Sequence, residues 1–123
     1  MSYRLSRLMS TASAGYAGFA LANPRHLGEA MQVDSDDLTG YDLLAQTYGA
    51  RDLAISSLGI FGRSGKTVKA AMLARIAFDL GDAAVLSRRT DDEDVRRKVL
   101  AVTLGWAALN TLALLVDSAR ADD

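Results

Sequence analysis

An uncharged apolar stretch near the C-terminus constrains this chain more than any other feature. Residues 99–116, VLAVTLGWAALNTLALLV, contain no charged side chain, and they are flanked by Arg96, Arg97 and Lys98 before and by Asp117 after. A helix of this length is about 27 Å long, close to the roughly 30 Å thickness of a bilayer's hydrocarbon core. The sequence therefore predicts that this stretch crosses a membrane.

Composition indicates one all-α domain. The chain has 123 residues, half of them hydrophobic and 24% charged, and the charges are clustered between long apolar runs. A single proline, Pro24, and many strong helix formers favour helices throughout. A net charge of −1 gives no basic face for nucleic acid, and the lack of cysteine excludes disulfides and thiolate metal sites. We expect no cofactor.

Four apolar segments predict four helices, at about residues 5–22, 42–61, 67–87 and 91–119. Asn23-Pro24 ends the first helix, and Thr90 with Glu93 forms a capping-box pattern at the start of the fourth. Residues 24–40 form the longest connection, with room for a short helix at 26–31. The other connections are short, which predicts a single-domain, four-helix up-down transmembrane bundle.

Five charged residues lie inside the second and third predicted helices, where lipid would penalise each of them by about 2.5–3.5 kcal/mol. Arg75, Asp79 and Asp82 are spaced i, i+4 and i+7, so they share one helical face. We expect Arg51 and Arg75 to neutralise the three carboxylates inside the bundle. This charge network consists of Arg51, Asp52, Arg75, Asp79 and Asp82. Three interpretations stay open: paired charges that fix the helix packing, a polar cavity or proton path, or a soluble bundle in which the charges face water.

Small residues are placed where helices in lipid pack closely. Gly49, Ser56 and Gly59 form a stripe on the second helix together with Asp52, and Gly105 lies on the fourth. Small side chains let two backbones approach each other, and polar ones then find partners across the contact. We therefore expect these four small residues to be helix-packing positions.

Two motifs that would indicate nucleotide binding or a histidine-based site are incomplete in this chain. Residues 65–67, GKT, resemble the end of a phosphate-binding loop, but that pattern requires glycine where this chain has Ile60. His26 is the only histidine and is predicted to lie in a loop, so neither a metal site nor a catalytic triad is indicated. We expect no catalytic residue.

The segment Tyr48-Gly49-Ala50-Arg51-Asp52-Leu53-Ala54, followed by Gly59, resembles an uncharacterised family of small four-helix bacterial membrane proteins, loosely DoxX-like. In that family a Gly-x-Arg-Asp segment opens the second helix, a proline follows the first, and an aspartate lies late in the third. Here the matching positions are Gly49, Arg51, Asp52, Pro24 and either Asp79 or Asp82. The resemblance implies a four-helix integral membrane protein and transfers no catalytic role.

Three functions are compatible with these observations. The first is a non-catalytic accessory or scaffold subunit of a larger membrane assembly, with the bilayer and other membrane subunits or further copies of itself as partners, and no nucleic acid. The second is a small transporter, or a lipid- or quinone-binding membrane protein, which requires a cavity that reaches the charge network. The third is a soluble four-helix interaction module. The first two place the chain in the bacterial inner (plasma) membrane as a multi-pass protein.

We predict that Arg51→Ala sharply lowers the yield of folded protein, because it leaves buried carboxylates without a counter-charge. The measurement is the amount of folded protein recovered from membranes, together with its thermal stability. Yield and stability equal to those of the wild type would contradict the charge network.

Overall fold

The computed structural model describes residues 3–121, and these residues form helices and no strand. The prediction of an all-α chain is confirmed. The α-helices are α1 (Arg4–Ala22), α2 (Arg25–Ala30), α3 (Leu38–Phe61), α4 (Gly65–Arg88) and α5 (Glu93–Ala121), with a 3-10 turn at Ser35–Asp37 before α3. The described chain therefore has five α-helices rather than four, because the short segment in the first connection is helical.

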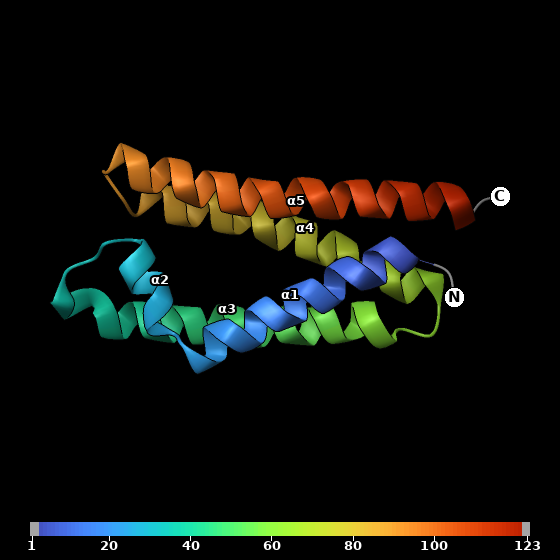
Figure 1. The fold of residues 1–123 in the computed structure, drawn as a ribbon, viewed down its shortest axis with the longest axis horizontal. Helices are drawn as coiled ribbons and strands as arrows, with labels where there is room; N and C mark the ends of the chain where they lie inside the picture. The colour runs from blue at the N-terminus through green and yellow to red at the C-terminus, as the bar shows by residue number, and fades with distance from the viewer. Residues whose placement is uncertain (1–2, 122–123) are drawn as a thin grey trace.

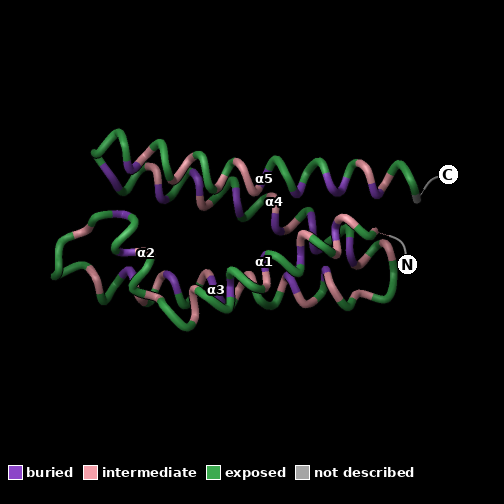
Figure 2. Tube along the Cα trace, viewed as in Figure 1, coloured by how far each residue is buried: buried purple, intermediate pink, exposed green. Residues whose placement is uncertain are grey.

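The four long helices alternate in direction and form two pairs, α1 with α3 and α4 with α5 (Figure 1). The pairs lie close together near the two chain ends and separate toward the other end, where α2 lies between them (Figure 1). Of the helices in residues 3–121, α5 is the one that is long enough and apolar enough to cross a membrane. Only 22% of its most apolar window is buried inside the protein, and exposed positions recur along its whole length (Figure 2).

Helix α3 begins at Leu38, four residues before the predicted start. The extra turn is stabilised by packing on α2, since Tyr41 is buried and a side chain at Gly28 would meet Leu38 Cδ2 at 2.8 Å. Helix α5 begins differently from the prediction. Asp92, rather than Thr90, accepts the hydrogen bond from the backbone N–H of Val95, at 3.1 Å. The predicted capping box at Thr90 and Glu93 is therefore wrong.

Two apolar clusters close the bundle at its two ends. One joins α2, α3, α4 and α5 through Met31, Tyr41, Leu86 and Val95. The other joins α4 and α5 through Val68, Met72, Ala113 and Leu114, with Leu5 and Met9 of α1 packed against it. Apolar side chains thus fill both ends, which leaves the middle of the molecule to polar residues.

Small residues bring α1 and α3 together. The buried face of α1 consists of Ser6, Ser10, Ser13 and Ala17. An added Cβ at Gly59 would lie 2.8 Å from Ser10 Cβ, and one at Gly49 would lie 3.2 Å from the Ala17 carbonyl oxygen. Close packing of this kind needs glycine at both α3 positions. Gly105 differs from the expectation, because an added Cβ there would meet no heavy atom within 4 Å among the described residues.

Charged side chains satisfy two helix ends across the bundle. Asp117 of α5 accepts hydrogen bonds from the backbone N–H groups of Ser6, at 2.6 Å, and Leu5, at 3.3 Å. Tyr3, at the N-cap of α1, contributes no side-chain hydrogen bond, so Asp117 takes over that role from another helix. The second helix end is the C-terminus of α3. There Arg7 of α1 donates to the carbonyl oxygens of Ile60 and Gly62, at 2.7 and 2.9 Å.

We predict that Asp117→Ala destabilises the protein by about 1–2 kcal/mol, because it removes the cap of α1 and leaves two N–H groups without an acceptor. Thermal unfolding of the purified variant measures the effect. The matched control is Asp91→Ala, which removes a carboxylate from the exposed α4–α5 turn. Equal melting temperatures for the two variants would contradict the capping role.

Candidate ligand-binding cavity

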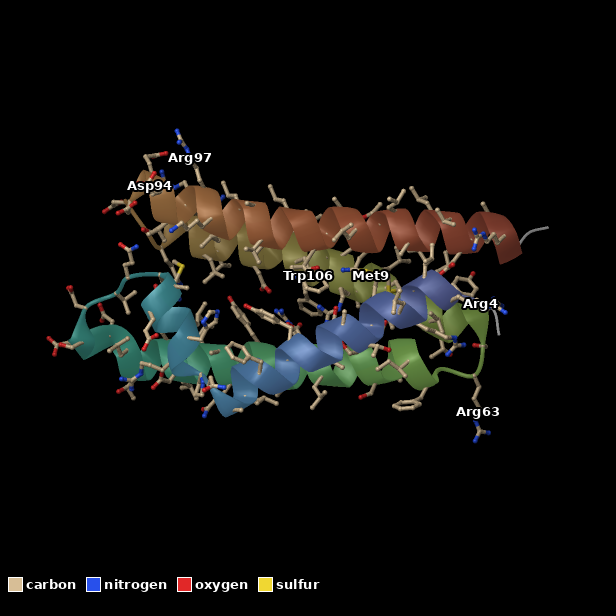
Figure 3. All side chains as sticks on the ribbon, viewed as in Figure 1. Arg4, Met9, Arg63, Asp94, Arg97 and Trp106 are labelled. Atoms are coloured by element: carbon tan, nitrogen blue, oxygen red, sulfur yellow. The ribbon has the colours of Figure 1, made fainter. Side chains whose placement is uncertain are left out.

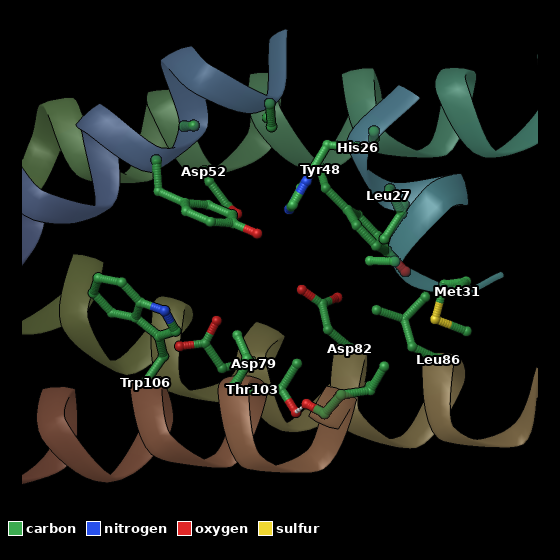
Figure 4. Close-up of a pocket in the computed structure, with 18 of the residues that line it drawn as sticks. His26, Leu27, Met31, Tyr48, Asp52, Asp79, Asp82, Leu86, Thr103 and Trp106 are labelled. Carbon is green, nitrogen blue, oxygen red and sulfur yellow. Dashed lines mark hydrogen bonds between the residues drawn. The ribbon is translucent and has the colours of Figure 1, made fainter. Parts of the chain in front are cut away.

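A cavity of about 470 Å³ lies between the two helix pairs, and all five α-helices contribute to its wall. Figure 4 shows Asp79, Asp82, Thr103 and Trp106 on the α4–α5 side, facing Tyr48 and Asp52 of α3. The volume is in the range of about 300–1,000 Å³ that is usual for small-molecule sites. Its polar and aromatic wall residues are Ser13, Tyr16, Asn23, His26, Glu29, Gln32, Tyr48, Asp52, Arg75, Asp79, Asp82, Lys98, Thr103 and Trp106.

The folding of α2 back over α3 closes one end of the cavity. Leu27 and Met31 form apolar wall there, together with Leu86 of α4. Arg25 fixes the position of α2, because its Nε and Nη2 donate to the Asp42 carboxylate at 3.0 and 2.7 Å. This hydrogen bond and the Asp42 charge raise the pKa of Arg25 above its ordinary value.

Aromatic rings form the wall near the middle of the bundle. The rings of Tyr16 on α1 and Trp106 on α5 lie 6.4 Å apart between centroids, at a tilt of 52°. This is the separation of a favourable aromatic pair. Because both residues line the cavity, an apolar molecule inside it would contact ring faces or edges from two helices.

Arg51 is the centre of the charge network. Its two terminal nitrogens donate to the two Asp82 oxygens at 3.0 and 2.7 Å, and its Nε donates to Asp52 at 3.0 Å. The Tyr48 and Phe78 rings lie 4.7 and 4.6 Å from its guanidinium carbon. Bidentate pairing and ring contact both suit a guanidinium and hold it in one orientation. Arg51 therefore connects α3 to α4.

Arg75 is 5% exposed and reaches from α4 to α3. Its Nη2 donates to Ser56 Oγ at 3.1 Å and to the Asp52 carbonyl oxygen at 3.2 Å. The same nitrogen lies 3.7 Å from the Asp52 carboxylate. The buried Ser56, expected to be a packing position, thus also supplies a hydrogen-bond acceptor.

Asp79 differs from the other members of the charge network. It is 8% exposed, and its Oδ2 is buried without a hydrogen-bond partner among residues 3–121. Two more buried atoms without partners, Ser13 Oγ and Arg75 Nε, also belong to residues of the cavity wall. Buried polar groups are normally hydrogen-bonded, so a cluster of exceptions around one cavity indicates that the cavity holds polar atoms. The expectation that an arginine pairs with Asp79 is wrong at the level of hydrogen bonding.

Sequence reasoning missed the part of the site that comes from outside α3 and α4. His26 and Trp106 both line the cavity, although His26 was expected in a loop and Trp106 was not among the predicted site residues. The serines on α1 were a usable signal, because Ser6, Ser10 and Ser13 recur at helical spacing. The predicted packing residue Gly49 lines the cavity as well, whereas Gly59 and Gly105 do not.

We predict that two neutral replacements on α4 have opposite effects on the ligand-free protein. Asp79→Asn raises thermal stability by about 1 kcal/mol or more, because it removes a buried charge that has no hydrogen-bonded counter-ion. Asp82→Asn lowers stability by about 1–3 kcal/mol, because it breaks the bidentate pair with Arg51. Thermal unfolding of the purified variants measures both. Destabilisation of equal size by the two replacements would contradict the distinction.

Comparison with protein-family models, curated proteins and solved structures finds no match. The resemblance to small DoxX-like four-helix membrane proteins therefore stays a prediction. The chemistry of the cavity and of the charge network is therefore the basis for assigning a function.

Proposed function

We propose that this chain is an integral membrane protein whose four long helices cross the bilayer and enclose a binding site for a small amphipathic molecule. The observation that carries the proposal is the cavity of about 470 Å³, which combines aromatic and aliphatic wall with partnerless buried polar atoms. A mostly apolar pocket with a few convergent polar groups is typical of small-molecule sites.

The distribution of charge along the molecule supports the membrane location. Arg4 and Arg63 lie at one end of the bundle, and Asp94 and Arg97 lie at the other (Figure 3). The charges near the middle of the helices belong to the charge network, whose members are buried or half-buried. An apolar belt with charged ends suits a protein in a bilayer, since central charges must be hidden from lipid.

Exposed apolar side chains support the same location. Each long helix presents several of them. They are Leu8, Tyr16 and Phe19 on α1, Leu43, Leu53, Leu58 and Phe61 on α3, Leu73, Phe78, Leu80 and Val85 on α4, and Val102, Leu104, Leu109, Leu112 and Leu115 on α5. Such surface is unusual for a protein in water and ordinary for one in lipid. α1, α3 and α4 are less apolar than α5 because their inward faces carry serines and ionic groups.

A ligand-binding role explains more features of the structure than an accessory role does. A scaffold subunit needs an outer surface for docking, and it has no use for a central cavity lined by Asp79, Arg75 and Trp106. A soluble module would expose its ionic groups and bury its leucines, whereas α4 and α5 bury Asp79 and Asp117 and expose most of their leucines. The binding role belongs to the second class of function that the sequence leaves open, a lipid- or quinone-type binder.

Trp106 is the single tryptophan, so its fluorescence reports directly on the cavity. We predict that an alkyl alcohol with a terminal bromine quenches Trp106 fluorescence saturably when the protein is in lipid nanodiscs. The reason is that the alkyl chain enters the cavity and brings the bromine close to the indole. Thr103→Phe, which places a ring in the cavity wall, abolishes the saturable component.

The matched control is Thr111→Phe on the same helix. Thr103 and Thr111 both donate to the carbonyl oxygen four residues earlier, at 2.7 Å, but Thr111 is exposed and lies outside the cavity wall. Quenching that rises linearly with the alcohol, or that the two variants change equally, would contradict binding in the cavity.

A further inference from the structure

The ionic groups around the cavity do not balance. The charge network holds two arginines and three aspartates, which leaves one negative charge in excess. Glu29 and Lys98 also line the cavity, are exposed, and offset each other. In a medium of low dielectric constant an excess charge is costly unless an opposite charge lies nearby. With His26 of the cavity wall counted as neutral, the wall carries one negative charge without a counter-charge.

The excess negative charge is located on Asp79. Asp52 and Asp82 are both held by Arg51, with nitrogen–oxygen distances of 2.9 and 2.7 Å. Arg75 directs its Nη2 to Ser56 and Asp52 on α3. Within residues 3–121, no hydrogen bond reaches the buried Oδ2 of Asp79. Because Asp79 lines the cavity, its carboxylate is the one in the charge network that is left for a donor bound there.

The surroundings of Asp79 suit an organic cation better than a metal ion. Figure 4 shows Asp79 on the cavity wall between Trp106 and Asp82. A tryptophan ring with a tyrosine ring 6.4 Å from it offers π faces to a cation. The described residues contain no group of three His, Cys, Asp or Glu side chains placed to hold a metal ion. Leu27, Met31 and Leu86, farther along the wall, provide apolar surface for a hydrocarbon body.

We propose that the ligand of the cavity is a protonated amine on an apolar body, with the Asp79 carboxylate as its counter-ion and Trp106 as its aromatic contact. This inference rests on the proposed function, because it names the chemical class that the same cavity selects. The ammonium group pairs with the Asp79 carboxylate, and the apolar body lies toward Leu27 and Leu86. Ser13 Oγ offers a second hydrogen-bonding position on the opposite wall.

The experiment compares three bromine-tipped alkyl probes of equal chain length that carry an ammonium, a hydroxyl or a carboxylate group. Each is titrated into wild-type protein in nanodiscs of neutral lipid, and Trp106 quenching gives its Kd. We expect the ammonium probe to bind most tightly, by roughly 10- to 100-fold over the alcohol, and the carboxylate probe to bind weakest.

Asp79→Asn tests the assigned residue. It should remove the preference for ammonium over alcohol while leaving the affinity for the alcohol within about threefold of the wild type, since the cavity itself is unchanged. Asp91→Asn, which removes an exposed carboxylate from the α4–α5 turn, should keep the full preference. Asp79→Glu retains the charge. If the asparagine variant does not fold, the affinities of this glutamate variant for the ammonium and alcohol probes are measured instead.

The outcomes separate the two proposals. If none of the three probes quenches saturably, the proposed function fails. If the alcohol binds saturably but the ammonium probe binds no more tightly, the cavity binds ligands and the cation assignment is wrong; a proton on Asp79 then supplies the missing charge. Loss of the ammonium preference in Asp91→Asn as well would also overturn the assignment, because the effect would then be one of overall charge.

Discussion

The salt bridges of Arg51 determine how the two helix pairs meet. One guanidinium holds Asp52 on its own helix and Asp82 on α4, and the rings of Tyr48 and Phe78 lie against it. Because α1 packs on α3 and α5 packs on α4, fixing α3 against α4 fixes all four long helices. The pairs are joined by this polar contact in the middle and by apolar clusters at the two ends. The cavity occupies the space that these three contacts leave.

The parts of the structure that follow a repeating pattern could be predicted from the sequence. Apolar runs separated by charged turns gave four long helices, and the i, i+4, i+7 spacing placed Arg75, Asp79 and Asp82 on one inward face. The stripe on α3 likewise placed Gly49 and Ser56 in the interior. Periodicity is a property of one helix, so it predicts which face is buried without a knowledge of the partner.

Features that depend on contacts between distant segments could not be predicted. Which carboxylate remains without a partner depends on the angles between α3 and α4, and no spacing in the sequence encodes them. The entry of His26 into the cavity wall depends on α2 folding back across α3, which Gly28 allows by its close contact with Leu38. The start of α5 was predicted incorrectly for a local reason. Thr90 and Asp92 can both act as an N-cap, and it is Asp92 that accepts the hydrogen bond from Val95, whereas Thr90 accepts one from the Asp92 N–H.

The contact between Asp117 and the beginning of α1 has a consequence for biosynthesis. The carboxylate that completes the first turn of α1 is synthesised more than a hundred positions after the amide groups that it caps. Until Asp117 reaches them, the amide groups of Leu5 and Ser6 need other hydrogen-bond acceptors, such as water. The first turn of α1 therefore stays without its cap until α5 has been synthesised and has packed against it.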